Sequence, residues 1–153
     1  MRKLFGLAAA MLFTLFSLNV AAVSDRATEP EAEAMVKKAI QFYDKVGKEK
    51  AVAGFNKSPG PFVDRDLYVT VYTPDGVALS HVNPKMVGKN MMELRDADGK
   101  YHIRERLEAS KTAPSGWQDF KFYNPVTKKI EPKRMYWEKH DGLVFACGAY
   151  KAL

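Results

Sequence analysis

The chain has 153 residues, of which 46% are hydrophobic and 12% aromatic. This length and composition predict one globular domain, and they exclude a multidomain machine and an intrinsically disordered chain. The formal charge is +6, and it falls to +4 when the two positive charges of residues 1–22 are left out. Because the other lysines and arginines are spread along the chain without a basic stripe, we expect no nucleic-acid partner.

The amino terminus has the pattern of a secretory signal peptide over residues 1–22. Met1-Arg2-Lys3 is a short positive region, residues 4–18 are apolar, and Val20-Ala21-Ala22 supplies the small residues that a signal peptidase recognises. We therefore expect a soluble domain over residues 23–153, periplasmic or secreted. The alternative is an uncleaved anchor, because the apolar run is almost long enough to span a bilayer. Only in that case is a membrane a partner.

The single cysteine, Cys147, lies in the apolar run 143–149. An exported domain with one cysteine has no internal disulfide, so its hydrophobic core must supply the stability. A cysteine in such a run is typically a buried thiol, and we expect that here in preference to a nucleophile.

Two helices are predicted at the start of the mature chain. Pro30 and the nearby glutamates favour a helix N-terminus, and Gly47 favours its end. Between them, apolar residues recur at steps of three and four and form one face. These residues are Met35, Val36, Ala39, Ile40, Tyr43 and Val46. A short helix is expected over residues 48–55, before a breaker-rich connection at residues 56–61.

From Leu67 the apolar period changes to two, which indicates strands. The sequence predicts strands at residues 67–72, 77–81, 117–123, 129–139 and 143–150, a long loop with one helical turn at residues 90–94, and a helix at residues 101–111. This order predicts an α+β fold in which the long N-terminal helix packs on a five-stranded antiparallel sheet, with a cavity under the central loop.

Motifs for catalysis or metal binding are absent from the sequence. The three histidines, His81, His102 and His140, lack the spacing of metal ligands. Asp96-Ala97-Asp98-Gly99 resembles the opening of a calcium loop, but the third acidic ligand and the closing glutamate are missing, so we expect a plain turn. We therefore expect no cofactor and no metal, and we rank an enzyme below a binding protein.

Lys133 is the residue that suggests ligand binding. Side chains alternate along a strand, so Lys133 shares one face with Met135 and Trp137, while Arg134 and Tyr136 share the other. A lysine under a loop needs a partner, and the carboxylate of a small ligand would serve. Periodicity equally allows a lysine whose ammonium reaches solvent at the sheet edge. Aromatic residues such as Trp117, Tyr123 and Trp137 are in the first instance core or rim residues.

Several short motifs, in this order and spacing, resemble those of a single Cache domain of the second type, the extracellular sensor module of bacterial chemoreceptors and histidine kinases. They are Tyr72-Thr73-Pro74-Asp75-Gly76, His81-Val82-Asn83-Pro84 with Gly88-Lys89, Gly116-Trp117 followed by Asn124-Pro125, and Lys133-Arg134-Met135-Tyr136 before Gly148-Ala149-Tyr150.

The resemblance covers the chain from about residue 30 to the end and implies a PAS-like fold. It also implies a pocket for a small organic acid such as acetate, propionate, pyruvate or lactate. The candidate ligand-binding residues that match the family's motifs are Lys133, Tyr136 and His81. The aromatic residues Trp117, Tyr72 and Tyr123 complete the candidate set.

Two departures from the family pattern affect the expected function. Phe120 stands where related sequences often have a tyrosine, so one hydroxyl that could contact the ligand is missing. Relatives usually continue into a transmembrane helix and a signalling domain, whereas this sequence ends at Leu153. We therefore expect a stand-alone sensor-type domain that binds a small acid without turnover and presents it to a protein partner. The alternative is an exported interaction module with a vestigial pocket.

Overall fold

The computed structural model describes residues 26–151, and the predicted signal peptide lies outside this range. The elements are α1 (Glu29–Val46), α2 (Lys48–Phe55), β1 (Val63–Asp64), β2 (Leu67–Tyr68), β3 (Thr70–Tyr72), β4 (Ala78–Ser80), the 3-10 helix η1 (Pro84–Met86), α3 (His102–Ala109), β5 (Ser115–Tyr123), β6 (Ile130–His140) and β7 (Leu143–Tyr150). None of the helices in this range is both long and apolar enough to cross a membrane.

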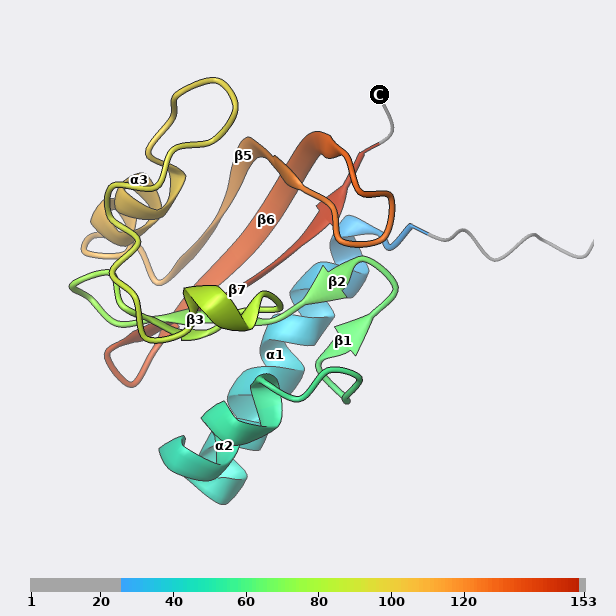
Figure 1. Ribbon diagram of the computed structural model, residues 1–153. Coiled ribbons are helices and arrows are strands. Elements are labelled where there is room, and N and C mark those ends of the chain that lie inside the picture. The colour runs from blue at the N-terminus through green and yellow to red at the C-terminus, as the bar shows by residue number, and fades with distance from the viewer. Residues whose placement is uncertain (1–25, 152–153) are drawn as a thin grey trace, which may run out of the picture.

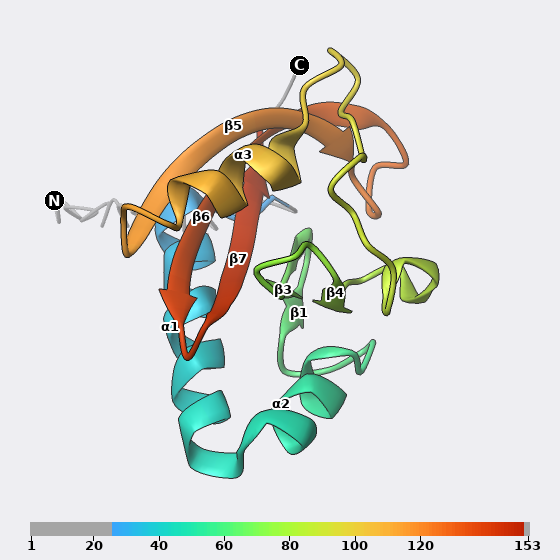
Figure 2. The same cartoon turned by 90° about the vertical axis from the view of Figure 1, so that its left-hand side faces the viewer.

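Five strands form one antiparallel sheet in the order β4-β3-β7-β6-β5. The N-terminal helix α1 runs along one face of this sheet, and α3 lies against the other, as the two views in Figures 1 and 2 show. The α+β fold with a long helix on a five-stranded antiparallel sheet is therefore confirmed. Every residue of β7 is buried, because this central strand is covered on both faces.

The sheet separates two hydrophobic clusters. On the α1 side, the helix residues Val36, Ile40 and Tyr43 pack against the β7 residues Phe145 and Cys147. This confirms the predicted apolar face of the helix and the predicted buried thiol, since Cys147 is completely inaccessible to solvent. On the other side, α3 and the long loop that precedes it pack on alternate residues of β5, β6 and β7. The candidate site lies on this second side.

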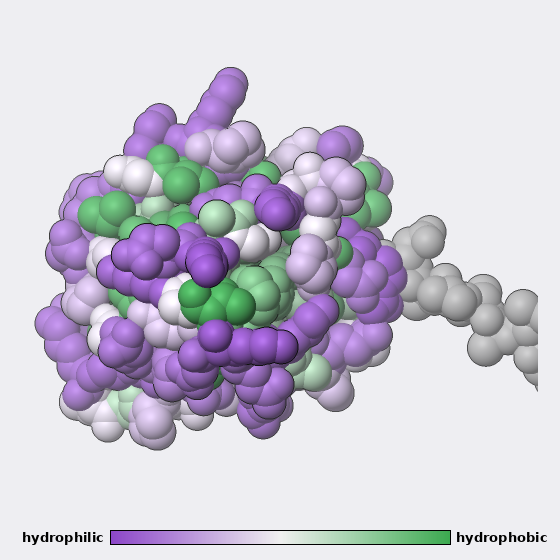
Figure 3. Space-filling view, turned by 90° about the horizontal axis from the view of Figure 1, so that it is seen from below, coloured by the Kyte–Doolittle hydropathy of each residue, from purple (hydrophilic) through white to green (hydrophobic). Residues whose placement is uncertain are grey.

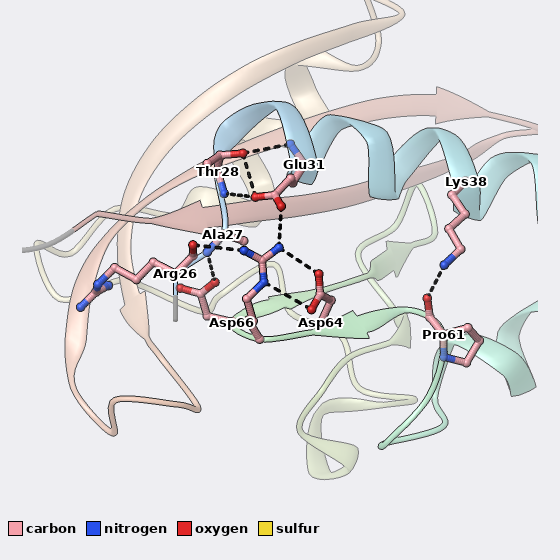
Figure 4. Close-up of polar contacts among 9 residues, drawn as sticks. Arg26, Ala27, Thr28, Glu31, Lys38, Pro61, Asp64 and Asp66 are labelled. Atoms are coloured by element: carbon pink, nitrogen blue, oxygen red, sulfur yellow. Dashed lines mark hydrogen bonds and ion pairs between the residues drawn. The ribbon is translucent and has the colours of Figure 1, made fainter. Parts of the chain in front are cut away.

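The start of α1 is held by a network of polar contacts that Figure 4 shows. Thr28 and Glu31 form a capping box, in which the Glu31 carboxylate accepts hydrogen bonds from the Thr28 N–H and hydroxyl at 2.7 and 2.8 Å. Arg65 donates to the same carboxylate at 2.6 Å, and these bonds lower the Glu31 pKa to about 2. Arg65 lies in the turn between β1 and β2, a two-stranded ribbon that the sequence analysis did not predict.

A second ion pair fastens the chain just before α1. Arg26 donates two hydrogen bonds of 2.8 Å to the carboxylate of Glu131 on β6. Glu131 is 2% exposed. Two parallel bonds between a guanidinium and a carboxylate fix orientation as well as distance. The chain just before α1 is thus fastened to β6, near the β5–β6 turn.

No helix forms at the predicted residues 90–94, because the helical turn of this loop is η1 at Pro84–Met86. Residues 91–94 form a hydrogen-bonded turn, in which the Leu94 N–H donates to the Met91 carbonyl oxygen at 3.1 Å. The side chain of Asn83 accepts a hydrogen bond of 3.0 Å from the Lys85 N–H, and Pro84 fixes the first backbone angle of the turn. Asn90 instead pairs with Val77 as an isolated bridge. The sequence signal was present, since an Asn-Pro pair is a common start of a helical turn.

The outer surface is mainly hydrophilic on the face shown in Figure 3, with hydrophobic side chains in small separate areas. In the described part of the chain, the large hydrophobic residues that are exposed are Tyr123, Val126 and Ile130, all at or beside the turn between β5 and β6. Single exposed hydrophobic residues are normal on a soluble surface, and they carry no argument by themselves.

Replacing Ile40 with Ala should lower the free energy of unfolding by roughly 2 to 5 kcal/mol, because Ile40 is 8% exposed in the cluster between α1 and β7. The matched control is Gln41→Ala, since Gln41 is the exposed neighbour on the same helix. Urea denaturation of both variants measures the difference. A loss of less than about 0.5 kcal/mol for Ile40→Ala would contradict the burial of this face.

Candidate functional site

Two adjoining cavities lie between the sheet and the loop that carries η1. The outer cavity has a volume of about 310 Å³, and the inner one, about 10 Å³, has room for roughly one water molecule. Tyr68, His81 and Phe122 line both, so they form the partition between them. The cavity expected under the central loop is therefore present, in two parts.

Lys133 enters this region from β6 and is fully buried at 1% exposure. Its ammonium lies 3.9 Å from the ring centroid of Tyr68 and 4.3 Å from that of Tyr150, and it has no hydrogen-bond partner. The alternative of a lysine that reaches solvent at the sheet edge is therefore excluded. Burial lowers the pKa of Lys133 to about 7, because the charged ammonium loses its hydration and gains no acidic partner in exchange.

A glycine on the neighbouring strand makes room for the Lys133 side chain. A Cβ atom at Gly148 would lie 2.8 Å from Cε of Lys133 and 2.9 Å from the Arg134 carbonyl oxygen. The lysine stem therefore crosses β7 at the one residue of that strand without a side chain. Lys133 itself lines neither cavity, but its ammonium touches the ring of Tyr68, which lines both.

Arg106 approaches the same region from α3, on the opposite side of the inner cavity from the sheet. It is 2% exposed and lines the inner cavity. Its Nε donates a hydrogen bond of 3.1 Å to Gln118, while one terminal nitrogen of the guanidinium is buried without a partner. Burial lowers the Arg106 pKa to about 10, which still leaves the group charged at neutral pH.

Sequence reasoning did not select Arg106. It predicted a helix at residues 101–111 without assigning its buried face, and the buried residues of α3 are His102, Ile103, Arg106 and Leu107. The signal that could have found Arg106 is its position three residues after Ile103 and next to Leu107, which places an arginine on the apolar face.

Neither Lys133 nor Arg106 forms an ion pair within residues 26–151. Asp66 is a buried acid, but it does not pair with either group. One of its carboxylate oxygens accepts a hydrogen bond of 2.9 Å from the Ala27 N–H. Buried charges in proteins are normally paired, because an isolated charge is expensive to remove from water. The site thus contains two buried basic side chains without an ion-pair partner, of which Arg106 is fully charged at neutral pH and Lys133 is charged in part.

His81 and His102 add neutral hydrogen-bonding groups. Nδ1 of His81 accepts a hydrogen bond of 2.9 Å from the Asn83 N–H, so the neutral ring carries its proton on Nε2. Burial, and then the charge of Lys133, lowers the His81 pKa to about 4. His102 stacks on Phe120 at 4.4 Å between ring centroids, and burial followed by the charge of Arg106 lowers its pKa to about 3. Both rings are therefore neutral at pH 7.

Tyrosine hydroxyls line the sheet side of the site. The Tyr150 hydroxyl donates to the Tyr123 carbonyl oxygen at 2.7 Å, so Tyr68 must be the donor in its 3.2 Å contact with the Tyr150 hydroxyl. Tyr72 lines the inner cavity, and burial raises its pKa to about 12. Tyr123 lines the outer cavity and is half exposed.

The structure brings four of the six sequence-predicted residues to this region: His81, Tyr72 and Tyr123 line the cavities, and Lys133 lies beside them. Tyr136 and Trp117 lie on the opposite face of the sheet, where Tyr136 belongs to the cluster beneath α1. Their rings are 5.2 Å apart, and the Tyr136 hydroxyl donates to Glu138 at 2.9 Å. Strand alternation, which separates Tyr136 from Lys133, is the reason.

The part of the chain that the structure describes contains no group of three or more histidine, cysteine or acidic side chains that could hold a metal ion. Asp96 instead closes a turn, because its Oδ1 accepts hydrogen bonds from the N–H groups of Asp98 and Lys100 at 2.9 and 2.8 Å. The prediction of a plain turn at residues 96–99 is confirmed.

Residues 11–150 match the family model of the single Cache domain 2. The chain belongs to this family. The match begins inside the predicted signal peptide, which is outside the described residues. No curated protein matches the chain significantly.

Three solved structures share the fold of this Cache domain. A methyl-accepting chemotaxis protein from Vibrio parahaemolyticus has a TM-score of 0.68 and 22% identity, over 79% of this chain and 86% of that one. A Cache chemosensory domain described for its carboxylic acid recognition has a TM-score of 0.69 and 18% identity, over 80% and 92%. The periplasmic sensor domain of a chemotaxis protein has a TM-score of 0.62 and 19% identity, over 80% and 90%.

The family match establishes the general class of the molecule, and the solved structures establish its fold. Cache domains are sensor domains, and one of the three similar structures is a periplasmic sensor domain. The predicted resemblance and the PAS-like fold are thereby confirmed.

Proposed function

We propose that this Cache domain binds a small organic acid, without chemical turnover, with the ligand carboxylate held near Arg106 and Lys133. The observation that carries the proposal is the pair of buried cationic groups, each with a nitrogen that lacks a partner. A carboxylate between the sheet and α3 would supply an acceptor for the unpaired nitrogen of Arg106, and its charge would favour the protonated form of Lys133 behind the Tyr68 ring.

The neutral groups around the inner cavity support the same ligand. Nε2 of His81 is the nitrogen that carries the proton and can donate it, because Nδ1 is the atom bonded to the Asn83 N–H. Tyr72 and Thr70 line the same cavity, although the Thr70 hydroxyl already donates to the Ala146 carbonyl oxygen at 3.2 Å. A carboxylate accepts up to about four hydrogen bonds, so a donor-rich cavity without an acid suits it. The resemblance stated above supplies the first ligands to test, which are acetate, propionate, pyruvate and lactate.

We further propose that the domain is exported by its amino-terminal signal and acts in the periplasm or outside the cell. A ligand-bound form would then be presented to a protein partner. The support is the sequence pattern of residues 1–22 together with the sensor class of the family. The intact mass of the exported protein tests the cleavage site, and recovery of the whole chain in the membrane fraction would indicate an anchor instead.

The alternative function is an interaction module whose pocket is vestigial. One observation favours it: the inner cavity is almost filled by the protein's own side chains, at about 10 Å³. A thermal-shift screen of organic acids separates the two functions. A ligand that binds only the folded state must raise the melting temperature, whereas a closed vestigial pocket gives no shift with any acid.

Replacing Lys133 with Met should weaken binding of the acid found in that screen by about tenfold, while the fold survives. Methionine keeps most of the apolar volume but removes the charge, and a charge-assisted interaction contributes roughly 1.5 to 3 kcal/mol. We expect an effect at the lower end of this energy range because Lys133 lies against Tyr68 and does not line the cavity. Calorimetric titration measures the affinity, and circular dichroism checks folding.

The matched control is Lys139→Met, which removes the same charge from an exposed position on the same strand. It should bind the acid as the wild type does. Equal affinities for wild type and a well-folded Lys133→Met would remove Lys133 from the proposed site.

A further inference from the structure

The two cavities differ in chemistry, and this difference bears on which acids fit. Around the outer cavity the side chains are mainly apolar, among them Val82, Met86, Phe122 and Pro125, and none of its lining residues carries a formal charge at pH 7. The inner cavity is lined by hydroxyl groups, two histidines and the guanidinium of Arg106. Among the residues that line the two cavities, the cationic side chain is Arg106, and it lines the inner cavity.

The proposed function places the carboxylate at Arg106, at the inner end. In that binding mode the rest of the acid extends past the residues that line both cavities and into the outer cavity. At about 310 Å³, the outer cavity is at the small end of the range for pockets that enclose small molecules. An acid of two or three carbons that binds at the inner end is too short to fill the outer cavity, so the apolar side chains there gain no contact with the ligand.

We infer that the site selects monocarboxylates with an apolar chain or ring of about four carbons or more, in preference to acetate, lactate and pyruvate. The inference rests on the proposed function, since it requires the carboxylate to bind at the inner end. Each methylene placed in the outer cavity should strengthen binding by about fourfold, which is the effect of removing one methylene from water.

A second carboxylate should be rejected for the same reason. The outer cavity offers it the side chain of Asn83 and the ring of His81, but no cation. A diacid must therefore lose the water around its second charge without gaining a partner. Glutarate, which has the five-carbon length of pentanoate, should bind at least tenfold more weakly than pentanoate.

The test is calorimetric titration of the whole exported protein with acetate, propanoate, pentanoate, hexanoate, phenylacetate and glutarate, in a buffer without carboxylates. We expect affinity to rise with chain length, phenylacetate to bind, and glutarate to bind poorly. Met86→Ala should reduce the gain per methylene, because Met86 lines the outer cavity only. Met92→Ala is the control, since Met92 is a partly buried methionine that lines neither cavity.

The outcomes separate this inference from the proposed function. Acetate binding with no gain for longer chains, or with equal affinity for glutarate and pentanoate, overturns the inference and leaves the proposed function standing. Binding of none of these acids overturns both. Hexanoate binding that is unchanged in Arg106→Met overturns the inference and also the role of Arg106 in the proposed function, while acid binding by the domain still stands.

Discussion

Replacing Arg106 with Met should weaken carboxylate binding by roughly a hundredfold or more, without lowering the stability of the domain. A guanidinium can donate two charge-assisted hydrogen bonds to one carboxylate, which is more than an ammonium behind a tyrosine ring can offer. Arg106 is 2% exposed and has a buried nitrogen without a partner, so an apolar side chain of similar length should suit the empty protein at least as well.

The matched control is Arg104→Met on the same helix. Arg104 is partly exposed and pairs with Glu93, so this variant removes an equal charge without touching either cavity. Calorimetric titration and urea denaturation of both variants give the affinity and the free energy of unfolding. Lower stability with unchanged affinity in Arg106→Met would show that Arg106 serves the fold and not the ligand.

Acidification from about pH 7 to about pH 5 should lower the free energy of unfolding by roughly 2 to 4 kcal/mol through His81 and His102. In the folded state, burial lowers their pKa values to about 4 and about 3, while in the unfolded chain both return to about 6.5. Below pH 6.5 the unfolded chain therefore binds protons that the folded one does not, so the free energy of unfolding decreases as the pH is lowered. The loss continues until the pH reaches the folded-state pKa values.

The pH interval is chosen so that the histidines dominate. Glu31 and Glu131 have pKa values lowered to about 2, so the stability that they contribute is lost only below about pH 4.5. The lowered pKa of Lys133 acts mainly above pH 7, where stability rises with pH. Urea denaturation at both pH values should show a much smaller drop in a His81→Gln, His102→Gln double variant.

His140→Gln is the control for this experiment, because His140 is partly exposed and its Nε2 lies 2.6 Å from Asp44. It should keep the full wild-type drop. The buffers must contain no carboxylate, since acetate or citrate could bind the site and mask the effect. An unchanged stability of the wild type at pH 5 would contradict the neutral, buried state of His81 and His102.

The fold was largely predictable because its strongest signals are periodic. The three- and four-residue steps from Met35 to Val46 gave the buried face of α1, and alternation gave the strands β5 to β7 within a few residues. The β1–β2 ribbon was missed because its turn carries Arg65 in the left-handed region, at φ 54°, where a glycine or asparagine is the usual signal. Contacts to Glu31 and Asp64 hold Arg65 in that turn.

The site was less predictable, because alternation gives the direction of a side chain and not its depth. Alternation placed Lys133 on the loop side of β6, but its burial depends on a glycine in another strand. Gly148, an isolated glycine in an apolar strand, is a known sign of close approach, and it could have indicated that burial. Arg106 needed the rotation of α3 about its axis, which eight residues with mixed polarity do not define.

The position of Cys147 also gives the molecule a built-in reporter. It is the only cysteine in the sequence, it lies on the central strand under α1, and burial raises its pKa to about 12. Because Cys147 is completely buried in the cluster beneath α1, a thiol reagent reaches it when α1 lifts from the sheet or β7 separates from its neighbours. The rate at which the unmodified wild-type protein is labelled therefore measures how often its interior opens, and a bound ligand that ties α3 to the sheet can be recognised by whether it slows that reaction.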